Sequence, residues 1–412
     1  MSFAFPFFTF FQPGIFWPQI ADYRPIQILA ILALLLSIGS KAEFDRTQVL
    51  RHPATKWLLL VPVTQALSVY PTGISNVLQE FMFWLVYPLF VLVSARIITG
   101  PAILRRYVWG LMIGCMWIVA FGMYAIPAGL NGTTGRAGAY GMYENHNDYS
   151  FIIIQILPFV FLFRRIETGF FARLFLTISS LACVVGIFAS LSRGGMLTLV
   201  LEGLLIVMFT MTPRRQLLLV PLLAVLGVGA IGYQYAKRAE NQGDSYTAED
   251  AQASRFELWR AGGNMLKQHP IFGVGSRMFG EVSMDYAEIS HDNREKNAHN
   301  TYIDLAATSG VVGFGVFMMM LVRAIRELRR PLGPEASDIL AATRKAALIA
   351  FYAIMFRAFL DAKSWDWSFY TLVMFAIVTG AMMKNHQENT DAMPESPSDL
   401  APVIPVTNQV SR

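Results

Sequence analysis

A histidine lies where a charged segment runs directly into an apolar helix. The stretch from Lys296 to Phe317 reads KNAHNTYIDLAATSGVVGFGVF, and His299 comes just before its apolar part. The partial positive charge at a helix amino terminus disfavours imidazolium, so we expect His299 to be neutral and able to accept a proton. The sequence therefore predicts a general base here, with a helix cap or an interfacial histidine as the alternative.

Two arginines have the chemistry to bind an anion. Arg193 lies in SLSRGG, a connection between apolar runs so short that its guanidinium must sit at the membrane surface or in a cavity. Arg255 opens a helical pattern, SRFELWRAGGNMLKQ, in which Trp259 shares its face. Arg260 points to another face and is expected to be solvated. Because guanidinium groups bind phosphate oxygens bidentately, these arginines suit a phosphate-containing substrate, with snorkelling or solvation as the alternative.

Polar and aromatic residues precede the sixth apolar run. Arg136 and the segment YGMYENHN at 140–147 include Tyr140, Asn145 and Asn147. Such side chains suit stacking on sugars and hydrogen bonds to hydroxyl groups, but they also suit the aromatic belt at a membrane interface. Both interpretations stay open for this segment.

A second group of charged and aromatic residues lies near the carboxy-terminal end. This group consists of Lys363, Trp365 and Trp367, which suit either sugar binding or a membrane interface. For the two tryptophans we predict the aromatic belt at the interface. Arg357 and Asp361 are four residues apart, so they are predicted to be a structural pair that satisfies each other.

Metal and cofactor chemistry is not indicated. The carboxylates between residues 240 and 288 have no metal-ligand spacing, so no metal and no cofactor are expected. GVVGFGV at 310–316 lacks the strand–turn–helix context of a dinucleotide fingerprint. Cys115 and Cys183 both lie inside apolar runs and are predicted to be small core residues.

Composition predicts an all-α, polytopic helical membrane protein. Hydrophobic residues make up 54% of the 412 residues and charged residues only 15%, whereas a soluble protein carries charge on about a quarter. Apolar runs long enough to cross a bilayer recur along the chain, and no cleavable signal peptide is expected. We predict about twelve spans, near 3–19, 26–39, 57–70, 78–95, 107–127, 148–163, 174–190, 196–212, 216–233, 302–322, 346–361 and 366–383.

Charge divides the chain into regions and sets its orientation. Basic residues alternate between connections, so the positive-inside rule places both termini in the cytoplasm and His299 on the outer face. The net charge of +5 is explained by this topology, and no nucleic acid partner is expected. The predicted regions are spans one to nine at 1–233, a large outer loop with short amphipathic helices at 234–301, spans ten to twelve at 302–383, and a disordered cytoplasmic tail at 384–412.

Four stretches together resemble the bacterial O-antigen ligase and O-antigen polymerase superfamily. They are the loop from Arg136 to Asn147, SLSRGG at 190–195, the run from Arg255 and Trp259 to HPIFGVGSRMF at 269–279, and AHNTYIDLAATSGVVG at 298–313. The resemblance covers about residues 130–325. One departure is Asn145-His146-Asn147, where the family often has Asn-Pro-Asn; His146 is then a possible second titrating group near the donor.

The resemblance implies a glycosyltransferase of the bacterial inner membrane whose site faces the periplasm. Its donor would be an undecaprenyl-diphosphate-linked glycan, and its acceptor a lipid A–core sugar. His299 would be the base, and Arg193 and Arg255 would hold the donor diphosphate. Arg136, Tyr140, Asn145, Asn147, Trp259 and Asn300 are the further residues expected to contact donor or acceptor.

Three other functions stay open. A polymerase would use a second lipid-linked glycan as acceptor, and a protein O-oligosaccharyltransferase would use a serine or threonine. A glycan flippase or other transporter would concentrate charged residues in the middle of its spans, where Arg357 and Asp361 are nearly alone. We therefore lead with the ligase.

Overall fold

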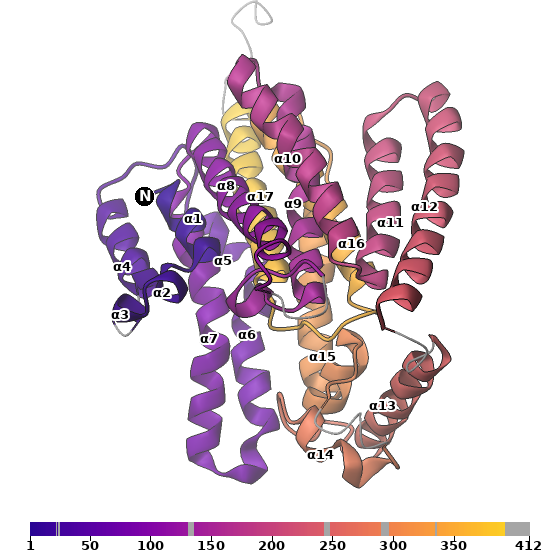
Figure 1. The fold of residues 1–412 in the computed structure, drawn as a ribbon. Coiled ribbons are helices and arrows are strands. Elements are labelled where there is room, and N and C mark those ends of the chain that lie inside the picture. The colour runs from indigo at the N-terminus through magenta and orange to yellow at the C-terminus, as the bar shows by residue number, and fades with distance from the viewer. Residues whose placement is uncertain are drawn as a thin grey trace, which may run out of the picture.

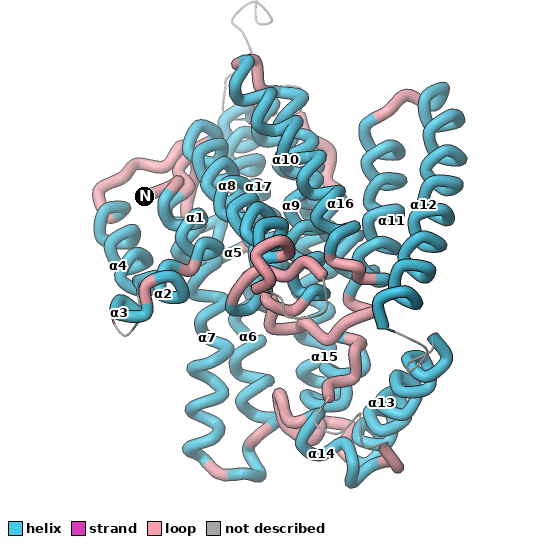
Figure 2. The backbone as a smooth tube through the Cα atoms, in the orientation of Figure 1, coloured by secondary structure: helices cyan, strands magenta, loops and turns pink. Residues whose placement is uncertain are grey.

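The computed structural model describes residues 1–391, except residues 22, 24, 131–135, 243–247, 290–295 and 334–335. Within these residues all regular secondary structure is helical, which agrees with the predicted all-α class (Figure 2). The order is α1 (Ala4–Phe11), α2 (Pro13–Phe16), α3 (Pro18–Ala21), α4 (Pro25–Ser37), α5 (Thr47–Arg51), α6 (Pro53–Ser68), η1 (Tyr70–Thr72), α7 (Ile74–Ile97), α8 (Pro101–Ala125), η3 (Gly141–Tyr143), α9 (His146–Ile166), α10 (Phe170–Ala189), α11 (Arg193–Thr210), α12 (Pro213–Gln242), α13 (Ala248–Gln268), α14 (Phe279–Tyr286), α15 (Thr301–Leu328), α16 (Asp338–Arg357) and α17 (Trp367–Asp391).

Eight of the described helices are long and apolar enough to cross a membrane. They are α7, α8, α9, α10, α11, α15, α16 and α17. The predicted total of about twelve is not confirmed. The chain is nevertheless a multi-pass helical membrane protein by length and composition of its helices.

The amino-terminal part departs most from the predicted spans. The span predicted at 3–19 is broken into α1, α2 and α3, and prolines stand at the start of α2 and α3. α4 has 13 residues and α6 has 16, which at 1.5 Å per residue fall short of a bilayer core of about 30 Å. At the other end, α17 continues to Asp391, past the predicted boundary at residue 383, and 392–412 lie outside the described residues.

The connections predicted to be cytoplasmic lie together. The turns from α9 to α10 and from α11 to α12 are both at the upper end of the molecule in Figure 1. The connections from α10 to α11 and from α16 to α17 lie near the centre, above α13 and α14 (Figure 1). The two connections at the upper end are flanked by basic residues, Arg164, Arg165 and Arg173 at the first and Arg214 and Arg215 at the second. Which side of the membrane they face stays a prediction from the positive-inside rule.

The predicted outer loop at 234–301 is largely helical. Its first residues belong to α12, which runs to Gln242, and the predicted amphipathic helix at 254–268 is the second part of α13. α13 ends at Gln268, directly before His269-Pro270, as expected from the proline. Leu258, Met265 and Phe279 belong to a small buried core that joins α13 and α14 to α15. Figure 1 shows these three helices in the lower part of the molecule.

α15 is broken at Gly310, and residues 270–275, which follow α13, pack against the break. Gly310 has φ 62° and ψ −171°, so the helix is interrupted and its neighbouring backbone groups are freed. Val311 N–H donates to Pro270 O at 2.8 Å, and Val274 N–H donates to Ala307 O at 3.0 Å. These bonds satisfy the freed groups and fasten the 270–275 segment against α15.

Replacing Gly310 with alanine is expected to lower the free energy of unfolding by about 1–3 kcal/mol, because only glycine readily adopts this backbone conformation. A Cβ atom at this position would also collide with the carbonyl of Ile271. The thermal unfolding midpoint of the purified protein measures the effect. Gly315→Ala is the matched control, since no atom lies within 4 Å of a Cβ at Gly315 in the same helix; equal midpoints for the two variants would contradict the prediction.

Candidate active site

His299 is held in an uncommon backbone conformation at the start of α15. Its φ is 49°, which is rare for a residue other than glycine. The next residue, Asn300, caps α15: its side-chain oxygen accepts from Tyr302 N–H at 3.0 Å and Ile303 N–H at 3.1 Å. On the other side, the Trp259 indole donates to Ala298 O at 2.9 Å. Bonds on both sides of His299 therefore fix its direction.

The connection between α16 and α17 is fastened to the same place. Thr301 N–H donates to Ala358 O at 2.8 Å, and the Thr301 hydroxyl donates to Asp361 O at 2.7 Å. The same hydroxyl oxygen accepts from Lys363 N–H at 2.9 Å. One threonine thus brings the 358–363 segment alongside His299.

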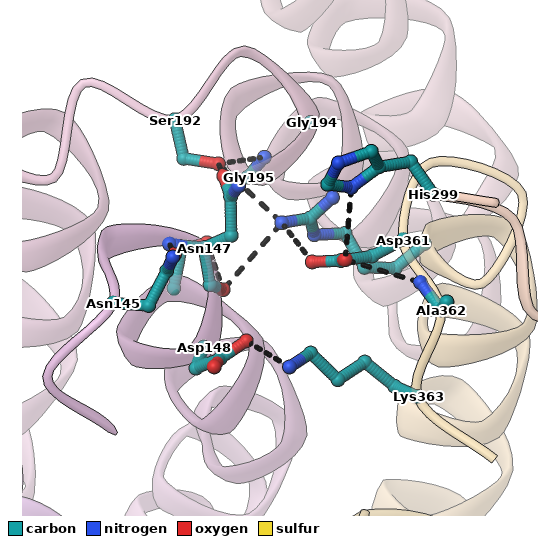
Figure 3. Close-up of polar contacts among 12 residues, drawn as sticks. Asn145, Asn147, Asp148, Ser192, Gly194, Gly195, His299, Asp361, Ala362 and Lys363 are labelled. Carbon is teal, nitrogen blue, oxygen red and sulfur yellow. Dashed lines mark hydrogen bonds and ion pairs between the residues drawn. The ribbon is translucent and has the colours of Figure 1, made fainter. Parts of the chain in front are cut away.

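Asp361 is the carboxylate that faces His299. Its Oδ1 lies 3.8 Å from His299 Nδ1 (Figure 3). Its Oδ2 lies 3.5 Å from Arg357 Nη2. Burial alone would raise the pKa of Asp361, but His299, Arg357 and Lys363 together lower it to about 2. Asp361 is therefore ionised at neutral pH. A carboxylate next to Nδ1 favours a proton on that nitrogen and leaves Nε2 as the proton acceptor.

The buried Arg357 guanidinium links three helices. Its Nη2 lies 3.4 Å from the Ser192 hydroxyl and 3.5 Å from Asn147 O. Ser192 caps α11 by accepting from Gly195 N–H at 3.2 Å, and its hydroxyl donates to Asn147 Oδ1 at 2.8 Å (Figure 3). The ends of α9, α11 and α16 meet in this network.

A second ion pair, between Lys363 and Asp148, connects the 358–363 segment to α9. Lys363 Nζ lies 2.5 Å from Asp148 Oδ1, in the first turn of α9 (Figure 3). Burial alone would lower the pKa of Lys363, but the carboxylates of Asp148 and Asp361 raise it above the ordinary value. Lys363 is therefore a charged, buried link between α9 and the 358–363 segment.

The two predicted anion-binding arginines border this network. Arg193 is half-buried at the first position of α11, next to Ser192. Arg255 is half-buried on α13, and its charge acts on Arg357. Arg260 is exposed, as predicted. Three guanidinium groups from α11, α13 and α16 are thus associated with the surroundings of His299, which provides positive potential for an anion.

Several predicted contact residues support the site instead of lining it. Arg136 donates to Ser190 O at 3.0 Å and so braces the SLSRGG turn. Asn145 caps α9, and Trp259 and Asn300 hold the residues beside His299. The buried Tyr140 donates to Phe11 O at 3.2 Å, so its hydroxyl is not directed to this network.

His146 occupies the first position of α9, and its Nδ1 is 3.0 Å from Ala137 O. Because proline is common at the first position of a helix, histidine and proline can both follow the Asn145 cap here. The turn is therefore a helix start in this chain. The His146 ring contacts the backbone of the preceding loop.

Sequence reasoning missed part of the network. Arg357 and Asp361 do pair, as predicted, but they lie beside His299 instead of apart from the site. The tryptophans predicted for an interfacial belt, Trp365 and Trp367, line a cavity. The sequence did contain a sign of this network, because Arg357, Asp361 and Lys363 lie within seven positions at the end of an apolar run. Ionisable residues in a membrane segment cost free energy, so they usually have a function.

Replacing Gly194 with alanine is expected to reduce the activity of this site by about 10- to 100-fold, because small displacements of positioning groups cost that much. A Cβ at Gly194 would collide with Nη1 of Arg357, so the guanidinium must move. Gly263→Ala in α13, where nothing lies within 4 Å of a Cβ, is the control. Steady-state turnover and the unfolding midpoint should be compared; unchanged turnover of the Gly194 variant would show that the position of Arg357 does not matter.

Comparison with known proteins gives two matches. Residues 178–318 match a family model described as Wzy_C, O-antigen ligase. The exopolysaccharide production protein ExoQ of Rhizobium meliloti (strain 1021) is 23% identical over 328 residues, which is 76% of this chain and 74% of that protein. The segment matched by the model contains Arg193, Arg255 and His299, but neither Asn147 nor Asp361.

Proposed function

We propose that this chain, a member of the O-antigen ligase and O-antigen polymerase superfamily, is an inner-membrane O-antigen ligase. It transfers a glycan from an undecaprenyl-diphosphate carrier to a lipid A–core sugar hydroxyl on the periplasmic face. The observation that carries this proposal is the pairing of His299 with an ionised Asp361 beside a group of arginines.

The reaction is a single displacement. Nε2 of His299 accepts the proton of the acceptor hydroxyl while the hydroxyl oxygen bonds to the anomeric carbon of the donor. The bond from that carbon to the diphosphate oxygen breaks, and the diphosphate leaves with the electron pair. Because one displacement occurs at the anomeric carbon, its configuration is inverted, and no pair of nucleophilic carboxylates is needed.

Arginines stabilise the leaving group. Negative charge grows on the diphosphate as the glycosidic bond breaks, and fixed guanidinium groups stabilise developing charge. Arg193 and Arg255 hold the diphosphate in this proposal, and Arg357 orients Ser192 and Asn147. Asp361 is a positioning residue that holds the imidazole through Nδ1.

The supply of positive charge by arginine makes the proposed reaction independent of metal. Treatment of the purified protein with a chelator is expected to leave the transfer rate unchanged. A loss of activity that one divalent ion restores would overturn the metal-free mechanism.

A polymerase is the second candidate. The observation that favours it is the likeness to a protein named for exopolysaccharide production. A polymerase would use the same base and the same arginines, but the hydroxyl would belong to a second lipid-linked glycan. The ligase and the polymerase therefore differ in the acceptor molecule, and the residues that catalyse the transfer are the same in both.

The test is a transfer assay with the full chain purified in lipid and supplied with a lipid-diphosphate-linked glycan. Parallel reactions contain lipid A–core, a second lipid-linked glycan, or no acceptor, each repeated with His299→Ala. A product on the core that is lost in the variant supports the ligase. A ladder that grows on the carrier without core supports the polymerase. Absence of free lipid diphosphate in every reaction contradicts both and favours transport.

A further inference from the structure

An aromatic cavity of about 520 Å³ lies next to the site. It is lined by residues of α6, α7 and α15 and by the 364–367 segment, and Figure 1 shows these helices close together. Five aromatic side chains form much of its wall: Phe83, Trp84, Tyr87, Trp365 and Trp367. Aromatic faces pack well against the apolar faces of sugar rings, and a cavity of this size suits a small ligand.

Two buried polar groups in this cavity have no hydrogen-bond partner within the described part of the chain. The Gln65 side chain is 1% exposed, and neither its Nε2 nor its Oε1 is bonded. Oδ1 of Asp304 is also buried and unbonded. Because burying such groups without partners is costly, they call for a ligand that both donates and accepts hydrogen bonds.

Charge selects a neutral ligand over an anionic one. Among the described residues that line the cavity, the only cation is Arg277, which is paired with Glu80 at 2.7 Å and stacks on Phe83 at 4.1 Å. The cavity is also lined by the Asp304 carboxyl, which would repel a diphosphate when ionised. None of Arg193, Arg255 and Arg357 lines the cavity.

The cavity reaches the residues on both sides of the base. Asn297 lies two positions before His299, and Asp304 lies five positions after it and interacts with it electrostatically. Ser364, another lining residue, directly follows Lys363. A ligand in the cavity can therefore place a hydroxyl near His299 while the arginine region remains free for the donor.

We propose that this cavity binds the acceptor: a neutral sugar ring packs against its aromatic wall, and Gln65 and Asp304 bond to its hydroxyl groups. This inference rests on the proposed transfer reaction. Lipid A–core and a second lipid-linked glycan both present such a ring, so the cavity serves either acceptor.

Gln65→Leu tests the proposal because it removes the amide and keeps similar volume. The KM for the acceptor is expected to rise about 10- to 100-fold, the cost of leaving a sugar hydroxyl without its partner, while the KM for the donor stays the same. The matched control is Gln155→Leu. Gln155 is also fully buried and unbonded within the described residues, but it does not line the cavity, so its variant should retain both KM values.

The kinetic assay is run with lipid A–core and with a second lipid-linked glycan, to identify which source supplies the ring. Suppose that the wild type transfers the glycan. An unchanged acceptor KM in Gln65→Leu, or an equal change of acceptor KM in Gln65→Leu and Gln155→Leu, would then overturn the proposed acceptor site without contradicting the transfer reaction. A changed donor KM in Gln65→Leu alone would assign the cavity to the donor and also overturn the proposal.

A binding measurement keeps the proposal testable if wild type shows no transfer. His299→Ala protein is titrated with core oligosaccharide freed of lipid A, and tryptophan fluorescence is recorded, because Trp84, Trp365 and Trp367 line the cavity. A saturable change that weakens at least tenfold in the Gln65→Leu, His299→Ala double variant supports a sugar site. No change, or equal affinity in both proteins, overturns it.

Discussion

Replacing His299 with alanine is expected to reduce glycan transfer by about a thousandfold while the protein remains folded, since a positioned general base contributes roughly 10²- to 10⁴-fold. The side chain is half-exposed, so its loss removes little packing. The backbone bonds of Ala298 and Thr301 do not depend on the imidazole. Free lipid diphosphate released per minute is the measure, with the unfolding midpoint as a check on folding.

His269→Ala is the matched control for that variant. His269 lies at the end of α13 and its Nε2 is 2.9 Å from the Tyr286 hydroxyl, so it belongs to the same outer region but not to the network around Asp361. It should keep near wild-type turnover. Near-normal turnover of His299→Ala would remove His299 as the base, and equal losses in both variants would indicate a general disturbance of the region.

The pH profile separates the base from its positioning residue. A pKa of about 2 keeps Asp361 ionised across the range in which enzymes are assayed. A fall in turnover toward acid pH would therefore not come from protonation of Asp361. Protonation of the base would cause such a fall, because a protonated imidazole cannot accept a proton. Asp361→Asn should lower turnover, because asparagine does not fix the tautomer of His299. It should also shift this acid limb to lower pH, because the protonated imidazole loses the carboxylate that stabilises it. A loss of turnover with an unshifted profile would mean that Asp361 acts only structurally.

The helices that reach across the membrane could be predicted because long apolar runs are a strong signal. α7, α8, α9, α10, α11, α15, α16 and α17 all correspond to predicted spans. Span count was harder, because prolines and short lengths make α1 to α4 and α6 ambiguous by hydropathy alone. The helical content of the outer segment was underestimated, since α13 and α14 carry charged residues and lack the apolar signal.

The association of charged residues depends on tertiary structure. His299 and Asp361 are 62 positions apart in the sequence. Local periodicity does not predict that Thr301 bonds to the 358–363 segment and so brings Asp361 beside His299. Likewise, a Cβ at Gly194 would collide with Arg357, a residue 163 positions away, so local sequence does not show why this position needs glycine. The broken helix at Gly310 was not predicted, because glycine inside an apolar run also suits helix packing.

Removing the guanidinium groups of Arg193 and Arg255 together is expected to raise the KM for the lipid-diphosphate donor by about 100-fold or more, since each charge-assisted bond contributes roughly 1.5–3 kcal/mol. Each single alanine variant should raise it by about 10-fold and leave the acceptor KM unchanged. Arg255→Lys should recover only part of the loss, because lysine keeps the charge but not the bidentate geometry.

The protein should tolerate the Arg255 substitution. Arg255 and Arg357 carry like charges that act on one another, so replacing Arg255 relieves a repulsion on the buried Arg357. Arg260→Ala is the control, because Arg260 is exposed and lies on another face of α13. If donor KM is the same in wild type, Arg260→Ala and the Arg193, Arg255 double variant, the diphosphate is bound elsewhere. The neutral aromatic cavity beside His299 would then be the next region to test for the donor, and the separation of anionic donor from neutral acceptor by charge would no longer hold.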